Sequence, residues 1–413
     1  MLDIKFVKKN KDLVIQNNQS RGVKVDVDEL LNLFKEVSER IQNIAGRRTE
    51  RNKHSKTKPS PEIREKMKLI GDYIQEEEKE LKKIQNEIYA LLAQLPNLNS
   101  TTTPIGSSEK DNQVEKTVGQ KPQFDFQPLP HEELAQKLDL IDIDKGSEIS
   151  GARFWYLKNQ LVELQWALLN YVFGKLLKAG FQPVVPPNLV KTKAMFGTGF
   201  FPAEKNEIYH VNSDKDDLYL IGTSEVPLVS YHADEVLNLK IPIKYFALST
   251  CYRREAGSYG KDNKGIFRGH QFDKIEMVVF CQPQESEKNH QEILAIEEEI
   301  WSELKIPYQV VNICSGDIGF QAAKKYDLEA WLPSQNKYRE VTSCSNTTDF
   351  QSRRLNIKYQ AGQKKELCHT LNGTGIAIGR ALIAIMENYQ TKEGSIKVPK
   401  VLQSYLSFKE IKK

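Results

Sequence analysis

The densest group of residues that could carry chemistry lies at positions 251–277, where two apolar segments flank a stretch rich in glycine and lysine. This pattern predicts two strands joined by a long loop. Arg253 on the outgoing strand and Arg268 on the returning one could grip one anion from both sides, because guanidinium forks match phosphate and carboxylate oxygens. Phe272 could stack on a nucleobase. The alternative is a surface hairpin whose charges are merely solvated.

A second group, at positions 340–346, combines a carboxylate with several hydroxyls. Glu340 and Ser343 offer the hard oxygen ligands that Mg²⁺ prefers. In a flat strand residues three apart point to opposite faces, so only a bend or bulge would let both reach one ion. The alternative is an ordinary edge strand rich in serine and threonine.

A third group pairs a glycine-rich run with a helix. Asn372, Thr374 and the glycines at 373 and 375 lead into a helical pattern that carries Arg380. Glycines there would permit close approach of the backbone to a ligand, and an arginine near the helix start could meet phosphate. The alternative is an ordinary helix start with an exposed arginine. The run Thr223-Ser224-Glu225 is uninformative by itself.

Other common site signatures are absent from the sequence. It contains no G-x-x-x-x-G-K-[ST], no strand followed by G-x-G-x-x-G, no H-E-x-x-H and no G-x-S-x-G. The five cysteines show no C-x-x-C spacing, so we expect no zinc, no disulfide framework and a reducing, cytoplasmic location. With no run of about 18 apolar residues and no signal pattern, we expect no membrane partner.

The elements that must position these groups form an irregular series of strands and helices. Apolar runs predict strands at 181–185, 218–221, 245–248, 275–280 and 308–313. Helical patterns occur at 157–178, 284–304 and 376–389. Because several strands follow one another without an intervening helix, we predict an α+β fold with an antiparallel sheet flanked by helices.

The N-terminal quarter has a different pattern. Apolar residues spaced alternately three and four apart run from Val27 to Ile44 and from Ile63 to Leu95, with Glu77 as the one break. This spacing predicts a helical hairpin over about 27–96, with Ser60 and Pro61 starting the second helix. Residues 1–25 are expected to form a short irregular lead. A dimeric coiled coil is the alternative.

Basic residues gather at the outer end of this hairpin. The chain carries 59 basic and 55 acidic side chains, and its excess of four falls within residues 1–96. A helical RNA backbone read by shape would suit such a basic end, whereas the alternative is a solvated tip. The residues expected to bind RNA are Arg47, Arg48, Arg51, Lys53, Lys56 and Lys58.

Composition divides the chain into three parts. Residues 97–130 are rich in serine, threonine, glutamine, proline and glycine, which is typical of a linker. We therefore expect an N-terminal nucleic-acid-binding domain at 1–105, a linker at 106–135 and a catalytic domain at 136–413.

In their order along the chain, these groups resemble the class II aminoacyl-tRNA synthetases, and among them the seryl-tRNA synthetase family. The hairpin is similar to that family's tRNA-binding arm, and residues 251–277 and 373–389 resemble its motifs 2 and 3. Gly180 followed by Pro186 resembles motif 1, which in the family lies at the dimer interface. Serine specificity is indicated by the runs GTGFFP (197–202), TSE (223–225), HQFDKIE (270–276), SCSN (343–346) and DFQSRR (349–354).

The resemblance implies a set of site residues. Those expected to act in catalysis are Arg253, Glu340 and Arg380, and Mg²⁺ would be held by Glu340 and Ser343. The serine-binding set is Thr223, Ser224, Glu225, Arg253, Glu276, Asn372 and Thr374. The ATP-binding set is Arg253, Arg254, Glu255, Arg268, Gly269, His270, Gln271, Phe272, Glu340, Val341, Thr342, Ser343 and Arg380.

The resemblance also implies individual roles for these residues. Arg253 would bind the α-phosphate and the serine carboxylate, and Phe272 would stack on adenine with Arg380 on its other side. Thr223 and Glu225 would receive the serine ammonium group. The serine hydroxyl would be surrounded by Glu276, Asn372 and Thr374.

The expected protein is an ATP- and Mg²⁺-dependent homodimeric ligase that makes seryl-adenylate and charges tRNA(Ser), with no DNA partner. Whether tRNA(Sec) is a second RNA substrate is left open by the sequence. Two alternatives are a non-catalytic RNA-binding relative and an enzyme that charges a carrier protein. The first should lack residues such as Arg253 or Arg380, and the second should lack the arm, whereas this sequence has both.

Overall fold

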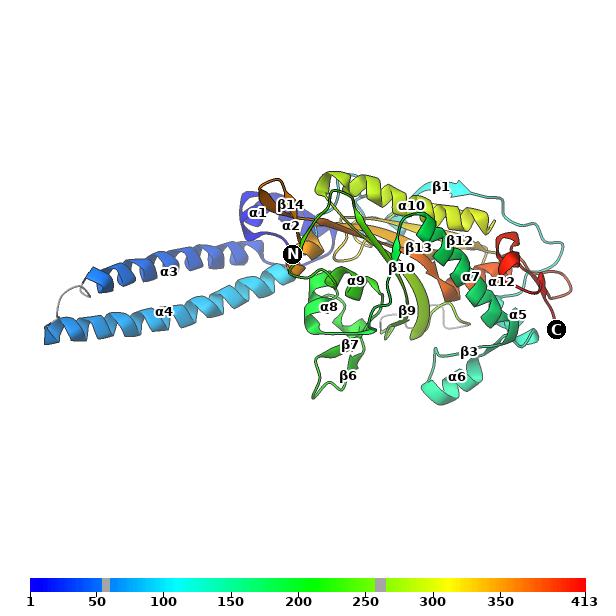
Figure 1. Cartoon of the computed structure of the whole chain (residues 1–413), viewed down its shortest axis with the longest axis horizontal. Coiled ribbons are helices and arrows are strands. Elements are labelled where there is room, and N and C mark those ends of the chain that lie inside the picture. Colours follow the sequence, from blue (N-terminus) through cyan, green and yellow to red (C-terminus); the bar gives the residue numbers. More distant parts are fainter. Residues whose placement is uncertain (54–59, 257–264) are drawn as a thin grey trace. The chain divides into compact units, whose positions relative to one another are not determined.

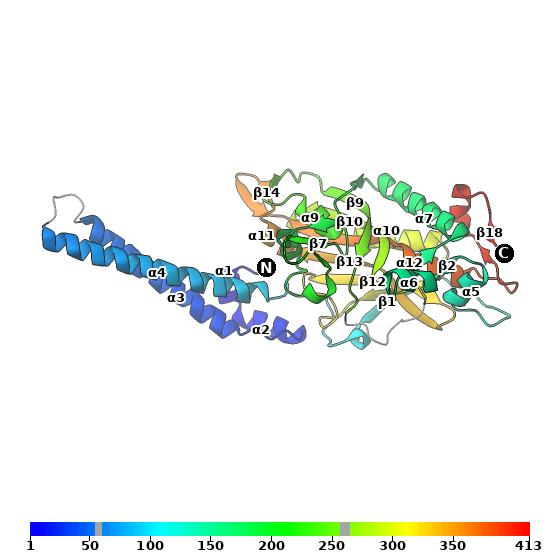
Figure 2. The same cartoon turned by 90° about the horizontal axis from the view of Figure 1, so that it is seen from below.

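The computed structural model describes residues 1–53, 60–256 and 265–413, which divide into two compact units, Met1–Leu98 and Asn99–Lys413 (Figures 1 and 2). All five cysteines are free and buried. Among these residues, none of the helices combines the length and the apolar character needed to span a membrane.

The described part of the first unit contains four helices: α1 (Ile4–Lys9), α2 (Lys11–Ser20), α3 (Val27–Lys53) and α4 (Pro61–Ala93). The long helices α3 and α4 run side by side in opposite directions (Figure 1), which confirms the predicted hairpin. The side chain of Ser60 caps α4 by accepting a hydrogen bond from the Ile63 N–H at 3.3 Å, and Pro61 occupies the first helical position, as predicted.

Two features of this unit differ from the sequence prediction. Residues 1–25, expected to be irregular, form α1 and α2, because Asp3 caps α1 and fully buried Val7 and Val14 pack into the apolar cluster of the hairpin base. The predicted seam residue Ile41 is 47% exposed. Arg40 instead faces α4 and donates to Glu77 at 2.9 Å, so Glu77, the apparent break, has an ionic partner across the hairpin.

The second unit is built on an eight-stranded sheet. Its spatial order is β1-β11-β12-β13-β16-β10-β9-β4, and every neighbouring pair is antiparallel except β4 and β9. In that order the strands are β1 (Gln113–Val118), β11 (Tyr308–Asn312), β12 (Lys324–Leu332), β13 (Lys337–Thr348), β16 (His369–Ala377), β10 (Gln271–Cys281), β9 (Ile243–Tyr252) and β4 (Gln182–Pro183). The predicted antiparallel α+β fold is confirmed.

Eight helices and four smaller sheets complete the described part of this unit. The helices are α5 (His131–Lys137), α6 (Ile143–Ser150), α7 (Asn159–Lys178), α8 (Thr192–Thr198), α9 (Glu225–Ser230), α10 (Ser286–Glu303), α11 (Phe350–Leu355) and α12 (Ile378–Asn388). The small sheets are β5 (Leu189–Val190) with β7 (Leu218–Leu220) and β6 (His210–Val211); β15 (Lys364–Leu367) with β14 (Lys358–Ala361) and β8 (Val236–Leu237); β17 (Ile396–Lys397) with β18 (Glu410–Ile411); and β2 (Ile141–Asp142) with β3 (Tyr156–Leu157).

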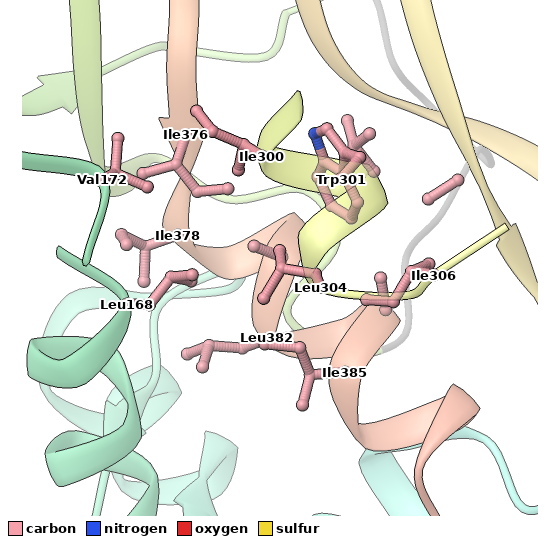
Figure 3. Close-up of a cluster of buried hydrophobic side chains, with 14 of the residues drawn as sticks. Leu168, Val172, Ile300, Trp301, Leu304, Ile306, Ile376, Ile378, Leu382 and Ile385 are labelled. Carbon is pink, nitrogen blue, oxygen red and sulfur yellow. The ribbon is translucent and has the colours of Figure 1, made fainter. Parts of the chain in front are cut away.

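The main core lies between one face of the large sheet and the helices α7, α10 and α12. Figure 3 shows this cluster, in which Val172 of α7, Trp301 of α10 and Leu382 of α12 are all fully buried. On β10, alternate residues such as Ile275 and Met277 belong to this core. The residues between them therefore face the opposite side of the sheet.

The stretch expected to be a linker contributes to the fold. Within residues 106–135, β1 pairs antiparallel with β11, and α5 buries Leu134 and Ala135 in the main core. Its polar composition suits β1 because five of that strand's six residues are exposed, as is typical of an edge strand.

Candidate active site

A cavity of about 540 Å³ lies on the sheet face opposite the main core. It collects residues from β10, β13 and β16, from the segment just after β9, and from the starts of α9 and α12. The predicted site residues that line it are Thr223, Glu225, Arg253, Glu255, Arg268, Gly269, Phe272, Glu276, Glu340, Val341, Thr342, Ser343, Asn372, Thr374 and Arg380. The structure thus brings together groups that lie up to 157 positions apart in the chain.

One wall of the cavity is formed by the β9–β10 hairpin. The alternation of a strand places Phe272, Lys274 and Glu276 on the cavity side. The Arg253 guanidinium lies 5.3 Å from the centre of the Phe272 ring, and its Nε donates to the Gly222 carbonyl at 3.2 Å. A flat aromatic face and a fixed cation therefore lie next to each other, an arrangement suited to a purine ring linked to phosphate.

Arg268 lies on the returning limb of this hairpin, just before β10, as predicted. It donates to Glu255 at 2.9 Å, which ties the returning limb to the end of β9. Arg253 and Arg268 both line the cavity, so a ligand there would contact one arginine from each limb of the hairpin.

The floor holds two carboxylates that are almost completely buried. Glu225 accepts hydrogen bonds from Gln351 at 2.7 Å and from Asn372 at 3.0 Å. Glu276 forms an ion pair with Lys274, whose ammonium also donates to the Thr223 hydroxyl at 2.9 Å. Burial, together with the nearby negative charge of Glu276, raises the pKa of Glu225 to about 8.

Burial likewise raises the pKa of Glu276, although Lys274 opposes this shift. Lys274 forms an ion pair with Glu276, whereas the hydrogen-bond donors to Glu225 are the neutral amides of Gln351 and Asn372. The two carboxyl groups therefore form an acceptor set that a bound ammonium group would complete.

A bulge in β13 explains how Glu340 and Ser343 reach the same cavity. Thr342 pairs with Leu328 and Glu340 pairs with Glu329, so Val341 is the extra residue of the bulged strand. The extra residue shifts the alternation of side chains along β13 by one position, so that Glu340 and Ser343 both face the cavity. Such a bend or bulge was required by the sequence prediction.

Glu340 is paired with Arg380, the cation that α12 contributes. The Arg380 guanidinium lies 3.1 Å from the Glu340 carboxylate and donates to the Glu340 carbonyl at 2.9 Å. Burial opposes ionisation of Glu340, but the charges of Arg380 and Lys325 outweigh it and lower its pKa to about 2. Arg380 also lies over the ring of Phe267, with 5.0 Å to its centre.

The donor set of Glu340 and Ser343 fits a hard divalent cation. An ionised carboxylate and a hydroxyl both face the cavity, and Mg²⁺ commonly binds through one or two protein oxygens while phosphate and water complete its shell. Groups of three or more His, Cys, Asp or Glu side chains that could hold a metal are absent from the described ranges.

Several cavity residues were missed from the sequence. Lys274 lies between Phe272 and Glu276 on one face of β10, so the alternation that selects its neighbours should have selected it as well. Lys325 of β12 also lines the cavity and forms an ion pair with Asp327. Burial raises the pKa of Asp327, although the charge of Lys325 opposes this shift. Their run, Lys325-Tyr326-Asp327, has the same alternation as β10.

Four predicted site residues do not line the cavity. The Ser224 hydroxyl is buried and donates to the Ala247 carbonyl at 3.4 Å. His270 bonds through Nδ1 to the Tyr209 hydroxyl at 2.9 Å, and Arg254 and Gln271 also lie outside the lining. For Gln271 the reason is the strand period, because it alternates with Phe272.

In the other unit, the predicted RNA-binding residues lie at the end of α3. Arg47 pairs with Glu50 at 3.2 Å and lies over the Tyr73 ring at 5.5 Å, and Arg48 pairs with Glu78. Arg51 and Lys53 occupy the last described turn. Lys56 and Lys58 fall outside the described residues.

Comparison with known proteins assigns both units. Residues 1–99 match the seryl-tRNA synthetase N-terminal domain, and residues 209–389 match the class II tRNA synthetase core domain (G, H, P, S and T). The chain is 43% identical to the serine–tRNA ligase of Dictyoglomus turgidum over 424 residues, which cover all of this chain and 99% of that one. It is 41% identical to the ligase of Treponema denticola over the whole of both chains.

Solved structures agree with this assignment. The seryl-tRNA synthetase of Pyrococcus horikoshii, solved in complex with ATP, matches with a TM-score of 0.95 and 40% identity over all of this chain and 99% of that one. The cytoplasmic serine–tRNA ligase of Naegleria fowleri, in complex with AMP, matches with a TM-score of 0.90 and 35% identity over the same shares. With full-length identity above 40%, matched models for both units and a shared fold, the chain belongs to the seryl-tRNA synthetase family of class II aminoacyl-tRNA synthetases.

Proposed function

We propose that the cavity binds ATP and L-serine side by side and joins them as seryl-adenylate. Serine activation and tRNA charging are the family's activity, and this chain is an enzyme of that kind. The observation that carries the proposal is the division of charge within the cavity. Arg253, Arg268 and Arg380 provide three cations near an aromatic face, whereas Glu225 and Glu276 provide buried acceptors on the floor.

The first step is displacement at the α-phosphorus of ATP. A carboxylate oxygen of serine forms a bond to this phosphorus, and the bond to the pyrophosphate oxygen breaks. No side chain has to act as nucleophile, so the protein contributes positioning and neutralisation of negative charge. Arg253 would bind the α-phosphate and the serine carboxylate, and Arg380 and Arg268 would bind the leaving pyrophosphate.

The adenine and the metal are assigned to neighbouring groups. Phe272 would stack on the adenine and Glu255 would lie near the base or its ribose. Glu340 and Ser343 would hold Mg²⁺, which when bound neutralises phosphate charge. Because the low pKa of Glu340 keeps it ionised at neutral pH, it is ready to exchange its partner Arg380 for a substrate-bound cation.

Serine would be recognised by the floor. Its ammonium group would meet Thr223 and Glu225, and its hydroxyl would meet Glu276, Asn372 and Thr374. Alanine would leave these buried groups without a hydroxyl partner, which costs more than a missing methyl group would. Threonine would be rejected because its extra methyl group meets a packed floor.

The tRNA would be bound by the arm. Arg47, Arg48, Arg51 and Lys53, together with Lys56 and Lys58, would contact the phosphate backbone. Arg47 and Arg48 are held by acidic partners of the same arm, so RNA phosphates would compete with Glu50 and Glu78. The proposed RNA is tRNA(Ser), and charging of tRNA(Sec) stays a prediction.

The proposed assembly is a homodimer. Large apolar side chains are exposed on α7 and on the adjoining β4–β9 edge, and a second copy of the chain would cover them. They are Trp166, Phe173, Leu177, Val185 and Leu248. Gly180 and Pro186 are close in sequence to Leu177 and Val185, so this surface includes part of the segment that resembles motif 1. We place the dimer in the cytoplasm, in keeping with five free thiols.

Replacing Arg380 by alanine tests the catalytic proposal. Serine-dependent exchange between ATP and pyrophosphate should fall by about 100-fold or more, because the leaving group loses a fixed cation. The control is Lys397→Ala, an exposed cation on β17, which should leave the exchange rate unchanged. Unimpaired exchange in Arg380→Ala would reject the assigned role.

Neutralising the end of the arm separates RNA binding from adenylate formation. In the variant Arg47→Gln, Arg48→Gln, Arg51→Gln, Lys53→Gln, pyrophosphate exchange should be unchanged, whereas KM for tRNA should rise by about 10-fold or more with a weaker salt dependence. The control Lys5→Gln, Lys9→Gln removes charges from α1. An unchanged KM for tRNA in the first variant would count against RNA contact by α3.

A charge placed on the apolar surface tests the dimer. Trp166 is 55% exposed, so Trp166→Glu should fold normally but lower the molar mass measured by light scattering from two chains to one. Ile149→Glu, on α6, is the matched control at another exposed apolar residue and should stay dimeric. A monomeric wild type, or a Trp166→Glu dimer of undiminished stability, would show that this surface is not the interface.

A further inference from the structure

His131, which no sequence motif singled out, contacts the cavity wall from behind. The residue begins α5 and is only 2% exposed. Its Nε2 accepts a hydrogen bond from the backbone N–H of Ile266 at 3.1 Å. Ile266 and the two residues after it, Phe267 and Arg268, all line the cavity.

The direction of this hydrogen bond defines the state of the imidazole. A backbone N–H can only donate, so Nε2 must carry a lone pair and the ring proton must be on Nδ1. Nδ1 lies 3.4 Å from the Glu387 carboxylate and 3.3 Å from that of Glu132. Two acceptors thus favour the tautomer in which Nε2 is free to accept from Ile266.

Glu387 links this contact to the helix that carries Arg380. It is fully buried on α12, where it accepts from the backbone N–H groups of His131 at 3.2 Å and Ser334 at 3.1 Å. Glu387 lies seven residues, about two turns, after Arg380 and therefore on the same side of the helix.

The glycine before Ile266 makes the close approach possible. Gly265 has φ = +70°, and a Cβ there would lie 2.0 Å from His131 Nε2. Any other residue at 265 would push the imidazole away. Further along the limb, the His270 N–H donates to the Arg153 carbonyl at 3.3 Å, so the segment before α7 holds this wall at two points.

We infer that His131 is a positioning residue for ATP. By holding the backbone of Ile266, it sets the place of Phe267, the ring over which Arg380 and Arg339 lie at 5.0 and 4.3 Å. Through its contact with Glu387, His131 also fixes residues 266–268 relative to α12. The inference rests on the proposed function, since it requires residues 266–268 and Arg380 to contact ATP.

The test compares KM for ATP and KM for serine in pyrophosphate exchange by the full-length enzyme. His131→Ala should raise KM for ATP by about 10-fold, because the Ile266 N–H loses a buried acceptor, and should leave KM for serine unchanged. His131→Gln should restore most of the loss, since an amide oxygen can accept from Ile266. Gly265→Ala should also raise KM for ATP, because its Cβ would displace the imidazole from the Ile266 N–H.

The inference would be overturned by an unchanged KM for ATP in His131→Ala, by equal rises in both KM values, or by failure of the glutamine variant to rescue. Gly265→Ala probes the same contact if His131→Ala fails to fold. A wild-type enzyme without serine-dependent exchange would instead reject the proposed function, which separates the two failures.

Discussion

The structure depends on balancing buried charges on one face of an antiparallel sheet. Lys274, Glu276 and Glu225 are all less than one tenth exposed. A buried ion without a partner costs several kcal/mol, so such groups persist only where opposite charges and hydrogen bonds surround them. Lys274 meets this requirement for Glu276 and Thr223, and Asn372 and Gln351 meet it for Glu225. The remaining imbalance is the one that substrates would correct.

The strands direct these side chains into the cavity because the pairing register shifts at two positions, one in β13 and one in β16. The bulge at Val341 turns Glu340 and Ser343 to the same side, and another irregularity in β16 leaves Gly375 unpaired so that Thr374 lies opposite Glu276. Without these two shifts, strict alternation along a strand would point one residue of the pair Glu340 and Ser343, and one of the pair Thr374 and Glu276, toward the apolar core. A carboxylate or hydroxyl would find no polar partner there. The catalytic geometry is thus a property of the backbone as much as of the side chains.

Much of this could be predicted from local patterns. The strand runs at 245–248 and 275–280 and the helix at 376–389 predicted β9, β10 and α12, and alternation explains why Phe272 and Glu276 share a face. What local patterns miss is pairing between distant segments. His131 contacts the cavity wall through Ile266, 135 positions away, so the residues next to it in the sequence carry no signal. Ile41 illustrates the same limit, because the Arg40–Glu77 pair decides which residue faces α4.

The most direct test of the charge balance is the number of protons released when serine binds to the free enzyme. At pH 7 a carboxyl group with a pKa of about 8 is mostly protonated, and an approaching ammonium group favours its ionised form. Calorimetric titration in buffers of different ionisation enthalpy should therefore show release of about 1 proton per serine at pH 7, and none in Glu225→Gln. Binding of serine to the wild type with no proton released would contradict the account.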